Sequence, residues 1–285
     1  MSPPTRRAAL GLLGGGLALL AAGPARGSTL PARVVTLGAA LGETVLALGH
    51  GARIVAADAG SAVVPGLEDR ATLGYHRQVS AEGVLAARPD LVLATTAAGP
   101  PAALDQIAAA GVRLLRLDDA PTLAGVTARI RAVGAAFAAG PAAEALLQTI
   151  EADLAAARAD APHPAPRVLF VYARGGGALQ IAGRDTAADL MIRLAGGENA
   201  LSESTGYVAL TPEAVAGARP AVLLLTTRGL EGLGGEAALR ATPGVAGLPG
   251  LRVVALEDGL LLGLGPRTGA GARALARALA GAGRP

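Results

Sequence analysis

The sequence predicts an α/β protein made of two Rossmann-like lobes with mainly parallel sheets, joined by one long linker helix, with a ligand cleft between the lobes. Three observations predict this fold class. Short apolar strands alternate with helical segments in both halves of the chain. A long segment rich in Ala, Leu and Glu separates the halves. One sequence pattern occurs once in each half.

The first residues have the features of a signal peptide. Thr5-Arg6-Arg7 precedes an apolar run at 8–22, which is shorter than the roughly 20 residues needed to span a bilayer. Ala25-Arg26-Gly27 offers a cleavage site before Ser28. We therefore expect residues 1–27 to be removed and the chain to be exported to a periplasm. The paired arginines fit the twin-Arg route, but no Phe-Leu-Lys follows them, so the general secretory route stays open.

The charge and the missing cysteine narrow the possible functions. All 25 basic residues are arginine, and loss of the three in the signal peptide takes the formal charge from +3 to about zero. The remaining arginines are scattered, so no nucleic-acid partner is expected. The absence of cysteine excludes disulfides, a thiol nucleophile and a Cys-anchored lipoprotein. We expect a freely diffusing protein that does not span a membrane.

Residues 28–140 are predicted to form the first lobe. Strands are expected at 33–37, 54–57, 91–95 and 112–117, and helices at 43–48, 81–87 and 102–110. Gly111 stands where the C-terminal cap of the last helix belongs. Strands that are separated by helices pair in parallel.

Residues 141–162 are predicted to form the linker helix. Pro141 suits the first helical turn, and Leu146, Ile150 and Leu154 recur at a spacing of four. A helix of about 20 residues is roughly 30 Å long. The proline-rich segment 161–166 then ends it.

Residues 163–285 are predicted to form the second lobe. Strands are expected at 168–171, 179–182, 221–226 and 252–256, and helices at 187–195, 212–218 and 268–282. This is the same alternation as in the first lobe.

One pattern occurs twice at a constant offset of 131 residues. Residues 80–96 read SAEGVLAARPDLVLATT, and residues 211–227 read TPEAVAGARPAVLLLTT. Each copy has a hydroxyl residue placed to cap a short helix, an Arg-Pro turn and an apolar strand. A Gly-Tyr pair precedes each copy, at Gly74-Tyr75 and Gly206-Tyr207. Two related lobes place a ligand between them, where loops leave the carboxyl ends of the strands.

Several kinds of catalytic chemistry are missing. Without lysine there is no P-loop and no Schiff base, and no Gly-x-Ser-x-Gly elbow occurs. The three histidines, His50, His76 and His163, do not pair at metal-ligand spacing. Gly175-Gly176-Gly177 follows a predicted strand but suits a hairpin-like turn better than a phosphate loop. These absences favour a binding protein over an enzyme.

The segment Leu73–Ser80 gives the most specific indication of a ligand-binding site in the sequence. Its Tyr75 is a hard oxygen donor suited to ferric iron, and Tyr is one of the axial ligands that proteins use for haem. Arg77, two residues on, is placed to stabilise the phenolate. His76 is a competing ligand or a pocket wall, and in an extended segment its side chain points away from that of Tyr75. An ordinary surface tyrosine in a polar loop is the alternative reading.

The chain resembles the haem-binding proteins of ABC haemin importers. The resemblance lies in GYHRQVSAEGVLAARPDLVLAT and AGPPAALDQIAAAGVRLL in the first lobe. In the second lobe it lies in IAGRDTAADLMIRLAGGENAL, GYVALTPEAV and LEDGLLLGLGPRTGAGARALA. It extends from about Arg33 to Leu279. Related helix-linked proteins bind ferric siderophores or cobalamin, and the Tyr-x-Arg motif is what points to haem.

The resemblance implies a set of ligand contacts. Tyr75 is the expected axial ligand and Arg77 its hydrogen-bond partner. Some relatives add a histidine from the second lobe, but no histidine follows His163, so five-coordinate iron is expected. Tyr207 is a candidate for the opposite wall. Arg228 and Arg267 are candidates to pair with the haem propionates, because guanidinium groups match carboxylates.

The resemblance also implies a partner. Such proteins dock on a permease through one acidic residue on each lobe; Glu43 fits the first lobe, and Glu198 the second, with Asp189 as its rival. The expected function is to capture haem in the periplasm and deliver it to an ABC permease with its ATPase subunits, without catalysis or a catalytic cofactor. The alternatives are a ferric-siderophore or cobalamin binder on the same scaffold, and a periplasmic haem-processing enzyme.

Overall fold

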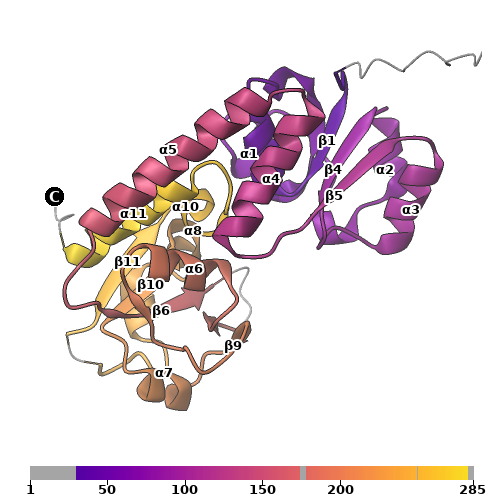
Figure 1. Ribbon diagram of the computed structural model, residues 1–285. Helices are drawn as coiled ribbons and strands as arrows, with labels where there is room; N and C mark the ends of the chain where they lie inside the picture. Colours follow the sequence, from indigo (N-terminus) through magenta and orange to yellow (C-terminus); the bar gives the residue numbers. More distant parts are fainter. Residues whose placement is uncertain (1–29, 174–177, 249, 282–285) are drawn as a thin grey trace, which may run out of the picture.

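The computed structural model describes residues 30–173, 178–248 and 250–281. It consists of two lobes, each built on its own sheet, with a long helix running along one side of both (Figure 1). The expected signal peptide, residues 1–27, and the expected turn at Gly175–Gly177 lie outside the described residues. No helix in the described ranges is both long and apolar enough to cross a bilayer.

The first lobe has a parallel five-stranded sheet in the order β3-β2-β1-β4-β5. Its strands are β1 Val34–Leu37, β2 Ile54–Ala57, β3 Ala71–Thr72, β4 Leu91–Thr95 and β5 Arg113–Leu117. The central strands β1 and β4 are buried along their whole length. Such continuous apolar runs are what a parallel sheet covered on both faces requires.

Helices cover both faces of this sheet. They are α1 Ala39–Ala47, α2 Ala81–Ala86, α3 Pro101–Ala109 and α4 Leu123–Ala136. Val34 and Leu91 pack with α1 and α4, whereas their strand neighbours Val35 and Val92 pack with α2 and α3. The two-residue period of the strands therefore divides the lobe into two cores, one on each face of the sheet.

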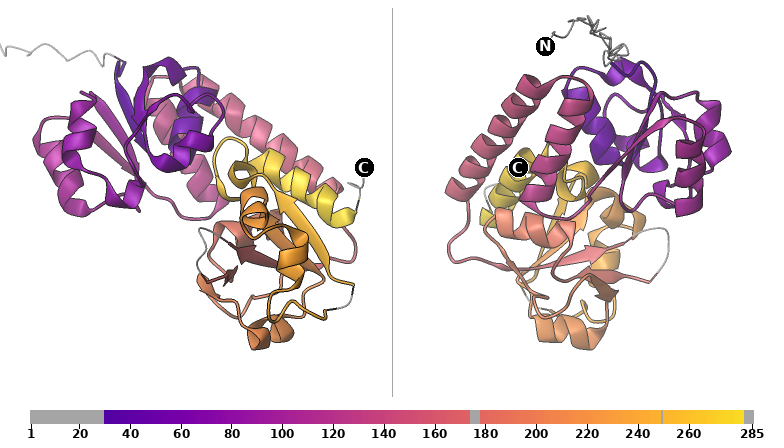
Figure 2. Two further views of the ribbon diagram at one scale, coloured as in Figure 1. Left: turned by 180° about the vertical axis from the view of Figure 1, so that it is seen from behind. Right: turned by 45° about the vertical axis from the view of Figure 1, so that its right-hand side comes forward.

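A long helix follows the first lobe in the chain. This helix, α5 Gly140–Ala159, packs against α4 and against the C-terminal helix α11 Thr268–Ala280. The two views in Figure 2 keep α5 and α11 side by side. Gly269 of α11 permits this close packing, because a Cβ there would lie 2.6 Å from the carbonyl oxygen of Ile150. Residues of α5 belong to the same apolar cluster as residues of both sheets, so one core continues from lobe to lobe.

The second lobe has a mixed sheet in the order β11-β10-β6-β7-β9, with β8 also paired to β6. Its strands are β6 Arg167–Tyr172, β7 Gln180–Ala182, β8 Glu198–Asn199, β9 Tyr207–Ala209, β10 Val222–Thr226 and β11 Arg252–Leu256. Pairing is parallel among β8, β6, β10 and β11, but β7 is antiparallel to β6 and to β9. Its helices are α6 Ala187–Leu194, α7 Pro212–Ala218, α8 Thr227–Gly232, α9 Glu236–Arg240 and α10 Asp258–Leu262.

The two copies of the repeated pattern fold alike. The side chains of Ser80 and Thr211 accept hydrogen bonds from the backbones of α2 and α7. The arginine of each Arg-Pro turn has a left-handed backbone, with φ 47° at Arg88 and 45° at Arg219. The strand that follows is the fourth of five in one sheet and lies beside β6 in the other. The lobes thus share a local design as well as a sequence.

Four helices were not expected from the sequence: α4, α8, α9 and α10. The α4 segment is bounded by Thr122, whose side chain accepts a hydrogen bond from Gly125. The α8 segment is rich in glycine, a poor helix former, so this helix depends on packing against β10 and β11 rather than on propensity. The helix expected at 43–48 begins earlier, at Ala39.

Candidate functional site

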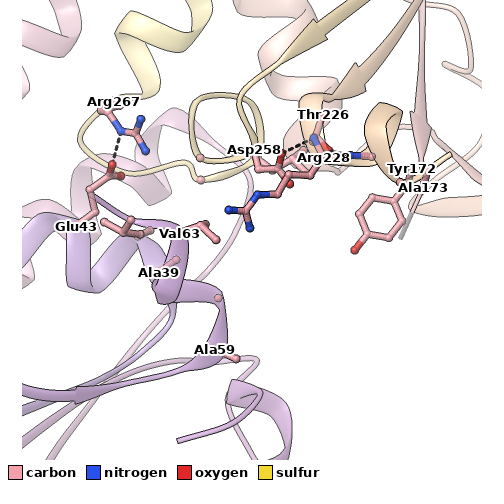
Figure 3. A pocket seen from close by; sticks show the side chains of 18 of the residues that line it. Ala39, Glu43, Ala59, Val63, Tyr172, Ala173, Thr226, Arg228, Asp258 and Arg267 are labelled. Atoms are coloured by element: carbon pink, nitrogen blue, oxygen red, sulfur yellow. Dashed lines mark hydrogen bonds and ion pairs between the residues drawn. The ribbon is translucent and has the colours of Figure 1, made fainter. Parts of the chain in front are cut away.

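A cavity of about 510 Å³ lies between the lobes, at the carboxyl ends of strands from both sheets. The first lobe contributes the start of α1, residues 59–64 and His76. The second lobe contributes Tyr172, Arg228 and residues of α8 and α10. Figure 3 shows these two walls facing each other. A pocket between two lobes is the arrangement predicted from the repeat.

An aspartate–histidine pair forms part of the first-lobe wall. Asp58 directly follows β2 and is 2% exposed. Its carboxylate accepts hydrogen bonds from the backbone of Gly38 and Gly60, both at 3.1 Å, and from the hydroxyl of Ser61 at 2.6 Å. The Nδ1 atom of His76 lies 3.3 Å from Asp58 Oδ2. Burial opposes ionisation, but the hydrogen bonds prevail and hold the pKa of Asp58 below its ordinary value of 3.8.

Tyr75 directly precedes His76 and is 43% exposed. A 3₁₀ turn, His76–Gln78, begins immediately after it. The turn brings the two rings together, with centroids 4.6 Å apart. The expectation that Tyr75 and His76 point to opposite sides of an extended segment was therefore wrong. His76 lines the cavity, whereas Tyr75, like Tyr207, is not among the cavity-lining residues of the described chain; its exposed ring lies next to that of His76.

Arg77 is exposed on the same turn. Its guanidinium makes no hydrogen bond or ion pair with another of the residues that the structure describes. Its support of Tyr75 stays a prediction.

The second-lobe wall contains an aromatic pair. Tyr172, at the end of β6, lines the cavity, and its ring centroid lies 5.4 Å from that of Tyr207. Tyr207, predicted as a wall residue, is 40% exposed and is not among the cavity-lining residues of the described chain. Tyr172 takes the position expected for Tyr207. The signal that identifies it was present, since it is one of three tyrosines and directly follows the strand expected at 168–171.

Tyr207 is chemically unlike an iron ligand. Although 40% of its surface is exposed, burial of the remainder and the neighbouring Tyr172 raise the pKa of Tyr207 to about 12. A ligand to ferric iron must be deprotonated, so this environment disfavours ligation and suits a neutral phenol.

The raised pKa of Tyr207 predicts a loss of stability in alkali. The folded state keeps the phenol proton above pH 10, where an unfolded tyrosine loses it. The stabilising contribution is complete below pH 10 and is lost as the pH rises through about 12. Urea unfolding of wild type and Tyr207→Phe should show a steeper fall for wild type over this range. The difference in the free energy of unfolding between the two proteins at pH 8 is the baseline. If this difference stayed constant up to pH 12, the raised pKa of Tyr207 would be contradicted.

Arg228 presents a positive charge to the cavity. It follows β10 at the start of α8, where Thr226 Oγ1 accepts a hydrogen bond from Gly229 at 3.1 Å. Its own backbone N–H donates to Asp258 Oδ2 at 3.4 Å. Figure 3 shows the side chain extending toward the first-lobe wall. Its guanidinium has no ion pair with a carboxylate in the described ranges, so it is placed to meet an acidic ligand group.

Arg267 also reaches the cavity but already has two partners. Its Nε donates to Glu43 of the first lobe (Figure 3). Its Nη1 donates to Glu257 at 2.8 Å. Burial raises the pKa of Glu43 above 4.5, although the hydrogen bond and charge of Arg267 oppose the rise. The pair ties the lobes together, so a role for Arg267 in binding propionate would require exchange of its carboxylate partner.

The Arg267–Glu43 pair involves one of the residues predicted to dock on a permease. Glu43 is 9% exposed and covered by Arg267, so it does not present a carboxylate on the outer surface. Glu198 is exposed and pairs with Arg167 of its own lobe. Asp189 is buried, and its carboxylate accepts hydrogen bonds from Arg193 at 2.9 Å and Asn199 at 3.0 Å. No docking role is tested by these contacts, and those of Glu43 and Glu198 stay predictions.

A second arginine ties the lobes from the opposite direction. Arg129 of α4 is 5% exposed, and its guanidinium donates to the carbonyl oxygens of Asp118, Ala120 and, across the lobe boundary, Leu264 at 3.0 Å. Sequence reasoning missed this residue, because nothing in the chain marks one arginine among 25 as buried.

The described residues contain no group of three or more His, Asp or Glu side chains that could hold a bare metal ion. The features of the site are a cavity with apolar and aromatic walls, an exposed phenol beside an oriented imidazole, and a free guanidinium opposite.

Comparisons with known proteins agree with this architecture. The haem-binding protein RhuT from Roseiflexus sp. RS-1 is 41% identical, with 88% of this chain and 98% of that chain covered, at a TM-score of 0.83. The haem-binding protein BhuT, solved with two haems, is 42% identical over the same shares, at 0.82. A periplasmic haem-binding protein from Pseudomonas aeruginosa is 36% identical, with 90% and 95% covered, at 0.78.

Two further matches concern the family. The uncharacterised ABC transporter substrate-binding lipoprotein YvrC of Bacillus subtilis is 27% identical over 153 residues, which is 52% of this chain and only 49% of that protein. The family model described as periplasmic binding protein matches residues 34–253, most of the described fold. The chain belongs to the periplasmic binding protein family.

Proposed function

We propose that this protein captures haem in the periplasm and delivers it to an ABC importer. The observation that supports this most is the interlobe cavity lined by His76, whose ring lies beside the exposed ring of Tyr75. Proteins of the same two-lobe architecture at 36–42% identity are haem-binding proteins. A flat apolar ligand with one open iron coordination position fits such a site better than a bare metal ion does.

Each part of haem has a counterpart in the cavity or directly beside it. The phenol of Tyr75 supplies a hard oxygen ligand to ferric iron. Tyr172 and the small apolar residues of α1 and α10 contact the porphyrin face and edges. Arg228 pairs with a propionate, because its guanidinium is not engaged by a side-chain carboxylate of the described chain. The protein binds and orients, and the chemistry needs no catalytic residue.

Haemin titration tests this proposal. Purified protein should retain haemin in a fixed stoichiometric ratio, with a ferric absorption band typical of phenolate ligation, and should bind a ferric siderophore and cobalamin far more weakly. Incubation with a reductant should return intact porphyrin. Tight cobalamin or siderophore binding without haemin binding would point to the alternative cargo, and conversion of the porphyrin would point to a haem-processing enzyme.

Delivery requires exposed groups that both lobes can present to a permease. The repeat supplies a matched pair, since Glu82 and Glu213 each lie exposed in the first turn of equivalent helices. Glu43 could contact a permease only after its ion pair with Arg267 breaks. Glu198 could do so only if the permease replaces Arg167 as its partner. We therefore favour Glu82 and Glu213 as the carboxylates that meet arginines of the permease.

Charge-reversal variants test which of these carboxylates contact the permease. Glu82→Arg combined with Glu213→Arg should slow association with the reconstituted permease and ATPase by about tenfold or more, because rim charges act mainly on the association rate. Haemin affinity should not change, since neither residue lines the cavity. Glu198→Arg is the matched control. A larger effect from the control would return the second-lobe role to Glu198.

A further inference from the structure

His76 is held in one orientation. Its Nδ1 atom faces the carboxylate of Asp58 at 3.3 Å. A carboxylate only accepts hydrogen bonds, so in the neutral ring Nδ1 carries the proton and Nε2 keeps a lone pair. The two nitrogens lie on opposite sides of the ring, and the ring lines the cavity. The free lone pair therefore belongs to the side of the ring that is turned away from Asp58.

Asp58 is a rigid support for this imidazole. It is 2% exposed and accepts hydrogen bonds from Gly38, Gly60 and Ser61. Gly38 follows β1, and Asp58 follows β2, so the anchor is tied to two adjacent strands. Histidines that bind metals in proteins are commonly backed by such a carboxylate, which fixes the tautomer and strengthens the nitrogen as a ligand.

The neighbouring ring offers the competing ligand. The centroids of Tyr75 and His76 are 4.6 Å apart, and both belong to one turn of one lobe. Two donors this close address the same face of a porphyrin, where only one axial position exists. They are therefore alternatives rather than a pair of ligands on opposite faces.

We infer that His76, oriented by Asp58, is an alternative axial nitrogen ligand that replaces Tyr75 when the iron of bound haem is reduced. This inference rests on the proposed function. A phenolate is a hard anion that prefers ferric iron, whereas a neutral imidazole suits ferrous iron as well. On one-electron reduction by a supplied reductant, the iron–phenolate bond breaks, the phenolate oxygen takes a proton from solvent, and His76 Nε2 donates its lone pair to the iron. The cavity then holds haem in both oxidation states.

Spectroscopy of wild type, three single variants and one double variant tests the inference. Haem-loaded wild type, His76→Ala, Asp58→Asn and Tyr75→Phe are compared by absorption and resonance Raman spectroscopy, oxidised and then reduced with dithionite. Wild type should change from an oxygen-ligated to an imidazole-ligated spectrum on reduction. His76→Ala should lose the imidazole signature of the ferrous form. Tyr75→Phe should have that signature in both oxidation states, and the double variant Tyr75→Phe/His76→Ala in neither.

The supporting carboxylate has its own expected effect. Loss of a group that orients a metal ligand typically costs about 10–100-fold in affinity. Asp58→Asn should weaken ferrous haem binding by about this factor and leave ferric binding less affected. His163→Ala and Asp105→Asn, which remove an exposed histidine and an exposed carboxylate elsewhere, are the matched controls.

Rescue by free imidazole guards against misfolding. His76→Gly should regain the ferrous imidazole spectrum on addition of imidazole, which would show that the variant still folds and holds haem with an accessible axial position. If wild type binds no haemin, the proposed function fails. If wild type binds haemin but its ferrous spectrum is the same in His76→Ala, only the present inference is overturned.

Discussion

Replacing Tyr75 with phenylalanine is expected to lower the affinity for ferric haem on the order of 100-fold. The substitution removes only the hydroxyl oxygen from a residue that is 43% exposed, so the fold should be unaffected. Loss of an orienting group behind a metal ligand already costs about 10–100-fold, and loss of the ligand itself should cost at least as much. Some binding should remain, because the cavity walls, Arg228 and His76 are untouched.

Tyr207→Phe is the matched control for this experiment. It removes the same atom from the tyrosine that precedes the second repeat copy, where the ring lies against Tyr172 instead of against the cavity-lining His76. Haemin titration should show a change of less than about threefold, which is less than 1 kcal/mol. Equal losses in the two variants would contradict the assignment of Tyr75, and a loss only in Tyr207→Phe would move the ligand to the second lobe.

The two-lobe fold was predictable because its signals are local. Residues such as Val34 and Val35 alternate between two cores with the period of a strand, and both are apolar because both faces of the sheet are covered. The Ser80 and Thr211 caps and the Arg-Pro turns stand at fixed positions in the repeat. These features depend on neighbours in the chain, so the sequence alone predicts them.

The walls of the cavity were less predictable because they depend on contacts distant in the chain. Tyr75 and His76 were identified, but their relative orientation depends on a single 3₁₀ turn that the sequence does not distinguish from an extended segment. Asp58 is 18 residues from His76, and Arg267 is 224 from Glu43. Neither pairing follows from spacing. The sequence therefore identified candidate ligand residues, whereas the groups that orient them emerged only from the packed structure.

The second large effect is expected at Arg129, which fixes the position of one lobe against the other. Its guanidinium donates to Leu264, a residue with the unusual left-handed φ of 46°, and that carbonyl group lies in a buried segment. The left-handed backbone is costly for a residue with a branched side chain and persists only where its surroundings enforce it. The bond from Arg129 is one such constraint, and the pair of Arg267 with Glu43 constrains the same loop from the other side.

Arg129→Met should lower the free energy of unfolding by about 2 kcal/mol, because a hydrogen bond from a charged donor contributes about 1.5–3 kcal/mol and the buried carbonyl of Leu264 is left without it. Burial of the Arg129 cation is unfavourable and lowers its pKa. Removing this buried charge therefore offsets part of the stability lost with its other two hydrogen bonds. Chemical denaturation gives the stability, and small-angle scattering should show a wider spread between the lobes. Arg131→Met, on the same helix with an exposed partner in Glu144, is the control and should leave both measurements unchanged. An Arg129 variant as stable as wild type would mean that the interlobe core and the Arg267–Glu43 pair alone hold the lobes in place.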